Sequence, residues 1–299
     1  MIKHLIRKRV ACILLAAMMF LTLSAGNVMT AKGVVNNARS GSVAKNITMK
    51  NKKWVTGQGG IYEDLDKDGY LDFISYGTSY YKIKIPSQGY IVVDVKTSSL
   101  PRSEEYEIFY DEPNDARTNI SLLNSKKKEL GAGGITIYEK SRAFTAGVKK
   151  GTYYISVEGD QKYKLRYSFT SVPKVSKAGK SLKNAVSLKQ GKTVKNLLMD
   201  GRNDLYYKIK LKKKSKVILS FQAKVKGEGF LDEMSVQLLV KKGKQYREVN
   251  EKGKLISKNQ SYWWEIDGKE KLTFHLPKGT YYIRTSTIGW GGYYTMKWQ

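Results

Sequence analysis

A hexapeptide that occurs twice constrains the fold of this chain more than any other feature. Lys-Gly-Thr-Tyr-Tyr-Ile occupies residues 150–155 and again residues 278–283. A second pair of similar segments, at 80–85 and 206–211, precedes the two copies at nearly the same separation. Two anchors at matching spacing indicate that one domain-sized unit is present twice.

The segments around these anchors alternate between apolar and polar residues, which predicts β-strands. In the clearest case, apolar side chains occupy every second position from Val217 to Val225. Strands with one apolar and one polar face are typical of antiparallel sheets that pack against each other. We therefore expect an all-β chain with two tandem antiparallel β-sandwich domains.

The composition of the chain predicts where these domains begin and end. Residues 1–26 combine a basic start, an apolar run from Val10 to Leu23 and small residues at 24–26, which predicts a signal peptide. A membrane anchor is the alternative, but the run is shorter than the roughly 20 residues of a spanning helix. The expected order is signal peptide 1–26, linker 27–43, first sandwich 44–172, linker 173–180 and second sandwich 181–299. No later stretch is long enough to span a membrane, and the only cysteine, Cys12, would leave with the signal.

Several short motifs resemble the bacterial pre-peptidase C-terminal domain, a jelly-roll-type β-sandwich. In the second copy, residues 184–191 resemble the opening strand of that family, residues 204–209 its D-x-Y-Y stretch, and residues 277–283 its P-x-G-T-Y-Y signature. The first copy matches less completely. The collagen-binding domains of clostridial collagenases are similar. The resemblance implies two jelly-roll-type sandwiches of a kind that accompanies secreted proteases and other surface enzymes, and these structural motifs support the fold more than a function.

The residues of the chain argue against catalysis. Without the signal peptide, His275 is the only histidine, and it lies in a strand-like stretch. No G-x-S-x-G, H-E-x-x-H or phosphate-loop motif accompanies it. We therefore expect no enzymatic activity, and interpret His275 as a solvated or core residue of a strand.

An acidic segment of the first copy predicts a calcium site. Residues 64–72 read D-x-D-x-D-G-x-x-D, so that carboxylates at alternate positions can surround one hard cation. The expected ligands are Asp64, Asp66, Asp68, Asp72 and the carbonyl of Tyr70. The segment resembles the calcium loops of integrin-type repeats and the start of an EF-hand loop, although Ser75 stands where an EF-hand has its bidentate glutamate. A surface turn without an ion is the alternative.

The charge of the chain is unevenly distributed. The formal net charge is +28. Residues 44–172 carry 20 basic and 16 acidic residues, for a net +4, whereas residues 173–299 carry 28 and 10, for a net +18. Runs such as Lys212, Lys213 and Lys214 fall at expected turns. A lysine-rich domain attracts polyanions without reading a nucleic-acid sequence; solubility and protection of edge strands are the alternative explanation.

Aromatic residues of the second copy are further candidates for ligand contacts. Trp263 and Trp264 are adjacent, so that one ring should face outward if the segment is a strand. Trp290 lies in a glycine-rich segment. Exposed rings stack on sugars or collagen-like chains, whereas rings in such loops more often pack on the edge of a core.

Together these features predict a secreted, extracellular binding or adhesion module that could be retained at a bacterial cell surface. Its expected partner is an anionic cell-wall polymer, a glycan or a matrix protein. An accessory or inhibitory partner of a secreted hydrolase or peptidase is the alternative.

Overall fold

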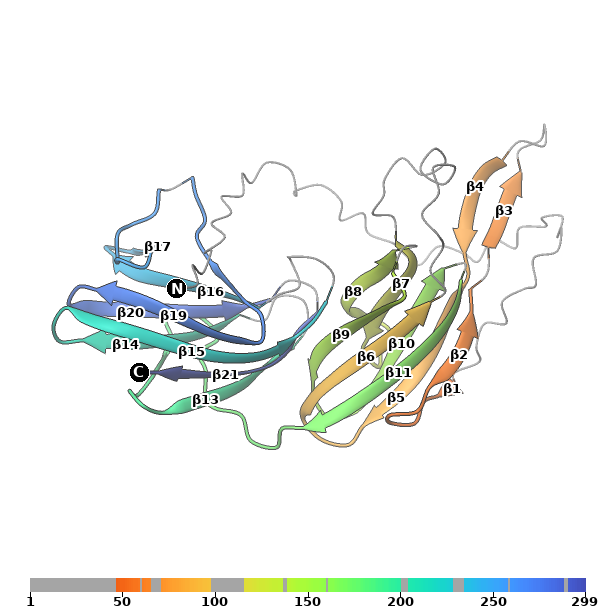
Figure 1. The fold of residues 1–299 in the computed structure, drawn as a ribbon, viewed down its shortest axis with the longest axis horizontal. Coiled ribbons are helices and arrows are strands. Elements are labelled where there is room, and N and C mark those ends of the chain that lie inside the picture. Colours follow the sequence, from red (N-terminus) through yellow and green to blue (C-terminus); the bar gives the residue numbers. More distant parts are fainter. Residues whose placement is uncertain are drawn as a thin grey trace, which may run out of the picture.

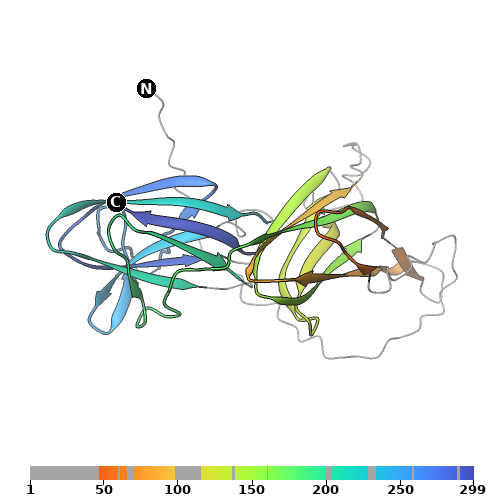
Figure 2. The same cartoon turned by 90° about the horizontal axis from the view of Figure 1, so that it is seen from below.

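The structure is a computed structural model that describes residues 47–59, 61–65, 71–97, 116–136, 139–159, 161–199, 204–227, 234–257, 259–287 and 290–299. All regular elements in these ranges are strands. The prediction of an all-β fold made of antiparallel β-sandwiches is thereby confirmed. The strands gather into two sheet pairs that lie side by side along the long axis of the molecule (Figures 1 and 2).

The first sheet pair, the N-terminal sandwich, uses residues between 47 and 171. One sheet has the order β1 (Ile47–Thr48), β5 (Thr78–Ile85), β10 (Gly151–Gly159), β7 (Ala116–Leu123) and β8 (Glu129–Thr136). The other has the order β2 (Val55–Gln58), β11 (Lys162–Ser171), β6 (Gly89–Thr97) and β9 (Ser141–Val148). A separate antiparallel pair joins β3 (Ile61–Leu65) to β4 (Leu71–Tyr76).

The second sheet pair, the C-terminal sandwich, uses residues between 186 and 298. One sheet has the order β12 (Val186–Ser187), β14 (Leu205–Leu211), β20 (Gly279–Ser286), β16 (Met234–Lys242) and β17 (Gln245–Glu248), with β18 (Trp264–Ile266) also paired to β16. The other has the order β13 (Thr193–Leu198), β21 (Gly292–Trp298), β15 (Ser215–Val225) and β19 (Lys269–Leu276).

The repeated segments occupy equivalent places in the two sandwiches. The hexapeptides form β10 and β20, which pair antiparallel with the Tyr-Tyr-Lys-Ile-Lys strands β5 and β14. The registers match, because Gly151 lies opposite Ile85 and Gly279 opposite Leu211. A short strand pairs in parallel with each Tyr-Tyr strand, which is a local exception to the antiparallel arrangement. The similarity of sequence therefore reflects a similarity of strand pairing.

Each sandwich encloses its own buried core. In β15, the side chains of Val217, Leu219, Phe221, Ala223 and Val225 are buried, and those between them are half-buried or exposed. The predicted alternation is therefore correct for this strand. A pair of tyrosines spans each core, with hydroxyl oxygens 2.8 Å apart in Tyr81–Tyr163 and 2.8 Å apart in Tyr207–Tyr294.

The two sandwiches meet at a packed joint. The fully buried ring of Trp290 belongs to the core cluster of the N-terminal sandwich, and its centroid lies 4.9 Å from that of Phe144. The Thr145 hydroxyl accepts a hydrogen bond from the Lys226 amide at 2.7 Å and donates to the Gly291 carbonyl at 2.7 Å. A Cβ atom at Gly147 would lie 2.6 Å from the Leu198 carbonyl oxygen, so this approach requires glycine.

The segment expected to be a linker, residues 173–180, is hydrogen-bonded to the C-terminal sandwich. Gly179 and Tyr206 exchange two backbone hydrogen bonds of 3.0 Å each. The Ser176 amide donates to the Lys195 carbonyl at 2.8 Å, and the Ser176 hydroxyl accepts from the Lys195 amide at 3.0 Å. The chain between the two sandwiches is thus anchored on one of them.

Candidate functional site

One outer face of the C-terminal sandwich carries a concentration of lysines. The strand registers of the β13-β21-β15-β19 sheet identify the positions that point away from the core, since partners across a ladder share a face. These outward positions include the lysines of what we call the lysine face: Lys195, Lys216, Lys224, Lys269, Lys271 and Lys297. Lys297 is half-buried and the other five are exposed.

The rest of the lysine face is uncharged or weakly basic. On these four described strands, no outward position holds an aspartate or a glutamate. Ser220 lies between Lys271 and Lys297 in one cross-strand row, and Lys216 lies opposite the exposed His275. Lys271 and Lys297 are two strands apart, which is about 10 Å, so they form a spaced array of positive charges on one face.

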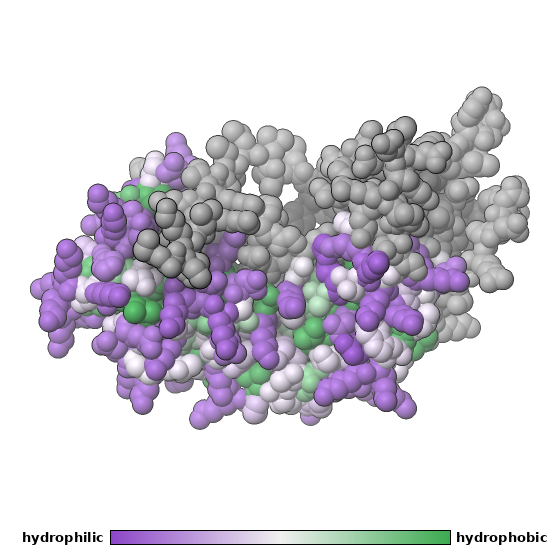
Figure 3. Space-filling view, in the orientation of Figure 1, coloured by the Kyte–Doolittle hydropathy of each residue, from purple (hydrophilic) through white to green (hydrophobic). Residues whose placement is uncertain are grey.

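Predicted site residues Lys212, Lys213 and Lys214 extend this basic surface. All three are exposed in the turn between β14 and β15, as the sequence predicts for a turn, and they precede Lys216. Lys192 is exposed beside the start of β13, whose first residue pairs with Lys297. Hydrophilic residues accordingly dominate the visible surface of the C-terminal sandwich in Figure 3.

The predicted aromatic site residues behave differently from one another. The prediction that Trp290 stacks on a ligand is wrong, because its ring is fully buried at the joint. Trp264 is half-buried and packs edge-on against Phe274, at 4.9 Å, and against Tyr262, at 4.9 Å. Trp263 is also half-buried. The sequence could not reveal that Trp290 lies against the other sandwich, because its partner Phe144 is far away along the chain.

Two of the predicted calcium ligands, Asp64 and Asp72, lie on β3 and β4. Asp64 is in β3 opposite Phe73, with a register shift directly after it, and Asp72 is in β4. Asp66, Asp68 and Tyr70 lie outside the described residues. The ranges that the structure describes contain no group of three His, Cys, Asp or Glu side chains placed to hold a metal. The calcium site stays a prediction.

A polar network covers part of the other sheet of the C-terminal sandwich, and sequence reasoning missed it. Arg284 contacts the Asp204 carboxylate at 2.8 Å and donates to Gln237 at 2.9 Å, and Gln237 donates to Glu248 at 2.8 Å. Burial raises the pKa of Glu248, which also accepts from the Tyr262 amide at 2.6 Å. The sequence did contain one indication of this network, since the aspartate of the D-x-Y-Y motif, Asp204, is the residue that pairs with Arg284. The network therefore contains one guanidinium group and two carboxylates, linked through Gln237.

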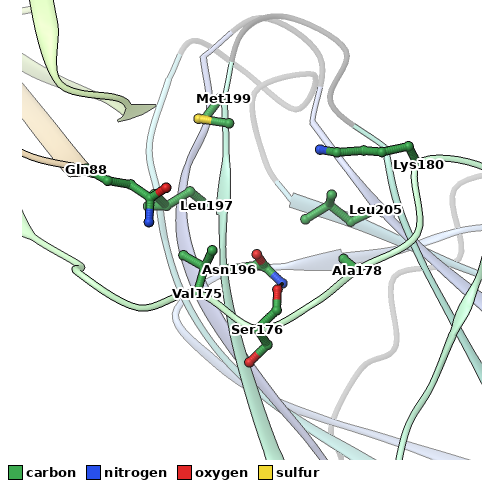
Figure 4. A pocket seen from close by; sticks show the side chains of 9 residues that line it. All are labelled: Gln88, Val175, Ser176, Ala178, Lys180, Asn196, Leu197, Met199 and Leu205. Carbon is green, nitrogen blue, oxygen red and sulfur yellow. Dashed lines mark hydrogen bonds between the residues drawn. The ribbon is translucent and has the colours of Figure 1, made fainter.

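A pocket beside the joint has a cavity of about 220 Å³ (Figure 4). It is lined by Gln88, Val175, Ser176, Ala178, Lys180, Asn196, Leu197, Met199 and Leu205. The Asn196 amide already donates to the Ser176 carbonyl at 3.0 Å and to the Tyr207 hydroxyl at 2.8 Å. The pocket is therefore mostly apolar, with its central amide engaged by the protein itself.

Comparisons with known proteins return only distant similarity. No family model matches the chain, and no curated protein matches it. Among solved structures, the pre-peptidase C-terminal domain of a Bacillus anthracis collagenase aligns at 15% identity over 42% of this chain and 96% of that one, with a TM-score of 0.27.

Two further solved structures align over more of the chain. The CUB1-EGF-CUB2 region of rat MASP-1 shows 10% identity over 84% of this chain and 99% of that one, with a TM-score of 0.24. The tandem CBM51 modules of a Streptococcus pneumoniae family 98 glycoside hydrolase show 8% identity over 80% and 86%, with a TM-score of 0.21. At these values the chain is assigned to no family, and its fold is defined by its own strand registers.

Proposed function

We propose that this chain is a secreted, non-enzymatic binding module that attaches to anionic polymers through its lysine face. The observation that carries the proposal is the β13-β21-β15-β19 sheet, whose outward positions hold six lysines and no carboxylate. Export and retention at a bacterial surface are part of the proposal, with a phosphate-rich wall polymer or an acidic glycan as the partner.

The chemistry of lysine favours a repeating polymer over a single small anion. An ammonium group is a compact point charge on a flexible stem, so it attracts phosphate or sulfate without imposing bidentate geometry. The lysines are distributed over one face of a sheet rather than gathered in a cavity, which suits a ligand that also presents many charges. Binding of this kind releases counterions and weakens as salt is added.

Equilibrium binding of the full chain to immobilised polymers tests the proposal. Heparin and polyphosphate should retain the protein at low salt and release it as salt rises, whereas neutral dextran should not retain it. The triple variant Lys269→Ala, Lys271→Ala, Lys297→Ala should bind at least tenfold more weakly, an effect of about 1.4 kcal/mol.

A matched control separates the contribution of the lysine face to binding from that of the overall net charge. Lys210, Lys241 and Lys244 are exposed on the other sheet of the same sandwich and its turn. Their replacement by alanine removes the same net charge and should weaken binding much less. Equal losses in both triples would mean that diffuse charge, not this face, attracts the polymer. Retention on collagen or dextran instead of the polyanions would favour a matrix protein or a neutral glycan as the partner.

A further inference from the structure

The outer face of a second sheet adjoins the lysine face. In the β2-β11-β6-β9 sheet, the register places one outward row through Lys164 and Lys96 and another through Thr170, Tyr90 and Gly147. The two lysines are exposed. The row with Tyr90 and Gly147 lies at the joint, so this face has a basic end and an end that contacts the C-terminal sandwich.

The two outer faces touch through named side chains. Tyr293 and Lys224 are cross-strand neighbours at the joint end of the lysine face. The ring of Tyr293 stacks on that of Tyr90, with centroids 5.6 Å apart and an interplanar angle of 15°. The Lys224 ammonium donates to the Tyr90 hydroxyl at 3.3 Å. At this point side chains from the outward rows of the two sheets are in direct contact.

We propose that these two outer faces form one continuous track for a linear polyanion with repeating phosphate or sulfate groups. The inference rests on the proposed function and specifies its ligand as a polymer long enough to cross the joint. From Lys216 to Lys224 the track follows β15 for about 27 Å, at roughly 3.3–3.4 Å per residue. Tyr90 is buried at the joint, and beyond it the track follows β6 to Lys96, which lies about 20 Å from Tyr90 along the strand.

The charges at the far end of the track support this assignment. Lys96 and Lys164 lie directly opposite each other on adjacent strands, an arrangement that is destabilising unless an anion offsets it. Arg166, unlike these two lysines, is paired with a carboxylate, because its guanidinium donates to Asp94 at 3.0 and 2.8 Å. The exposed ring of Trp54 lies under the Arg166 guanidinium, with its centroid 4.5 Å from the guanidinium carbon. Lys96 Nζ lies 5.3 Å from the centroid of the same ring.

The joint makes simultaneous contact with both faces favourable. Trp290, Thr145 and Gly147 fix the two sandwiches against each other through buried and backbone contacts. A polymer that crosses the joint therefore gains its second set of contacts without ordering a flexible linker. Such an intramolecular second contact raises affinity well beyond that of either face alone.

A length series of size-defined polyphosphates and heparin oligosaccharides tests the track on the full chain. Affinity should rise steeply once the ligand is longer than about 27 Å, the span of the lysine face along β15. The double variant Lys96→Ala, Lys164→Ala should weaken binding of long ligands by about fivefold or more and leave short ligands unaffected. It should also lower the salt slope for long ligands by roughly one to two.

The matched control is Lys126→Ala, Lys128→Ala, which removes two exposed lysines from the turn between β7 and β8 of the same sandwich. This control should change the affinity for neither short nor long ligands. If Lys96→Ala, Lys164→Ala leaves long-ligand affinity unchanged while the lysine-face triple still weakens it, the track is wrong and the proposed function stands. If neither polymer binds at any length, both are wrong. If affinity rises with ligand length for just one of the two polymers, the track is supported. That polymer then identifies phosphate or sulfate as the group that the track binds.

Discussion

The ring of Trp290 packs on the ring of Phe144, with centroids 4.9 Å apart, although the two residues belong to different sandwiches. Both side chains are fully buried. A residue of the C-terminal sandwich therefore completes the core of the N-terminal one. The two units are coupled by packing, and the polar contacts of Thr145 reinforce this coupling.

Replacement of Trp290 by alanine should destabilise the chain by about 3–5 kcal/mol, because it leaves a cavity in the N-terminal core. Denaturant unfolding of the full chain measures this change. The variant should also separate the unfolding of the two sandwiches into two transitions. Trp54→Ala is the control, since that ring is 37% exposed and its loss should cost much less. Equal effects of both substitutions would show that Trp290 does not couple the sandwiches.

The buried tyrosine pair of the C-terminal core should make stability fall at alkaline pH. Burial raises the pKa of Tyr207 and, more strongly, that of Tyr294. Unfolded phenols ionise near pH 10, so this contribution is fully present below about pH 10 and is lost as pH rises above it. Urea midpoints of the parent and of Tyr294→Phe, measured at each pH, isolate the effect because the two proteins differ only in this one hydroxyl group.

Tyr294→Phe should be less stable than the parent near pH 8, by about 1 kcal/mol, because it lacks the hydrogen bonds to Tyr207 and Thr285. The difference should shrink as pH rises past 10. A difference that is constant over this range would contradict the account of the buried pair.

Calcium should raise the thermal midpoint of the full chain if the acidic segment holds the ion. The prediction depends on the sequence pattern of Asp64, Asp66, Asp68 and Asp72, whose mutual repulsion a divalent cation would neutralise. Asp66→Ala should abolish the shift, and magnesium at equal concentration should produce a smaller one. An unchanged thermal midpoint at millimolar calcium would contradict the predicted calcium site.

The sequence predicted the features of the fold that are local. Alternation identified β15, and the repeated hexapeptides identified β10 and β20, because strand periodicity is visible within a few residues. The turn position of Lys212, Lys213 and Lys214 was predicted for the same reason. These inferences need no knowledge of distant contacts.

The sequence could not predict what depends on the register between distant strands. The lysine face combines residues from β13, β15, β19 and β21, which are separated along the chain and become neighbours only through pairing. The burial of Trp290 depends on Phe144 in the other sandwich. Net charge indicated that the second half is basic, but not that one sheet face lacks carboxylates.

The salt dependence of polyphosphate binding tests the central claim most directly. For the full chain, the logarithm of the association constant should fall linearly with the logarithm of salt concentration, by roughly 0.7–0.9 per lysine engaged. The variant Lys269→Ala, Lys271→Ala, Lys297→Ala should lower that slope by roughly two to three. An unchanged slope in this variant, or binding that does not respond to salt, would contradict the assignment of the lysine face as the polyanion site.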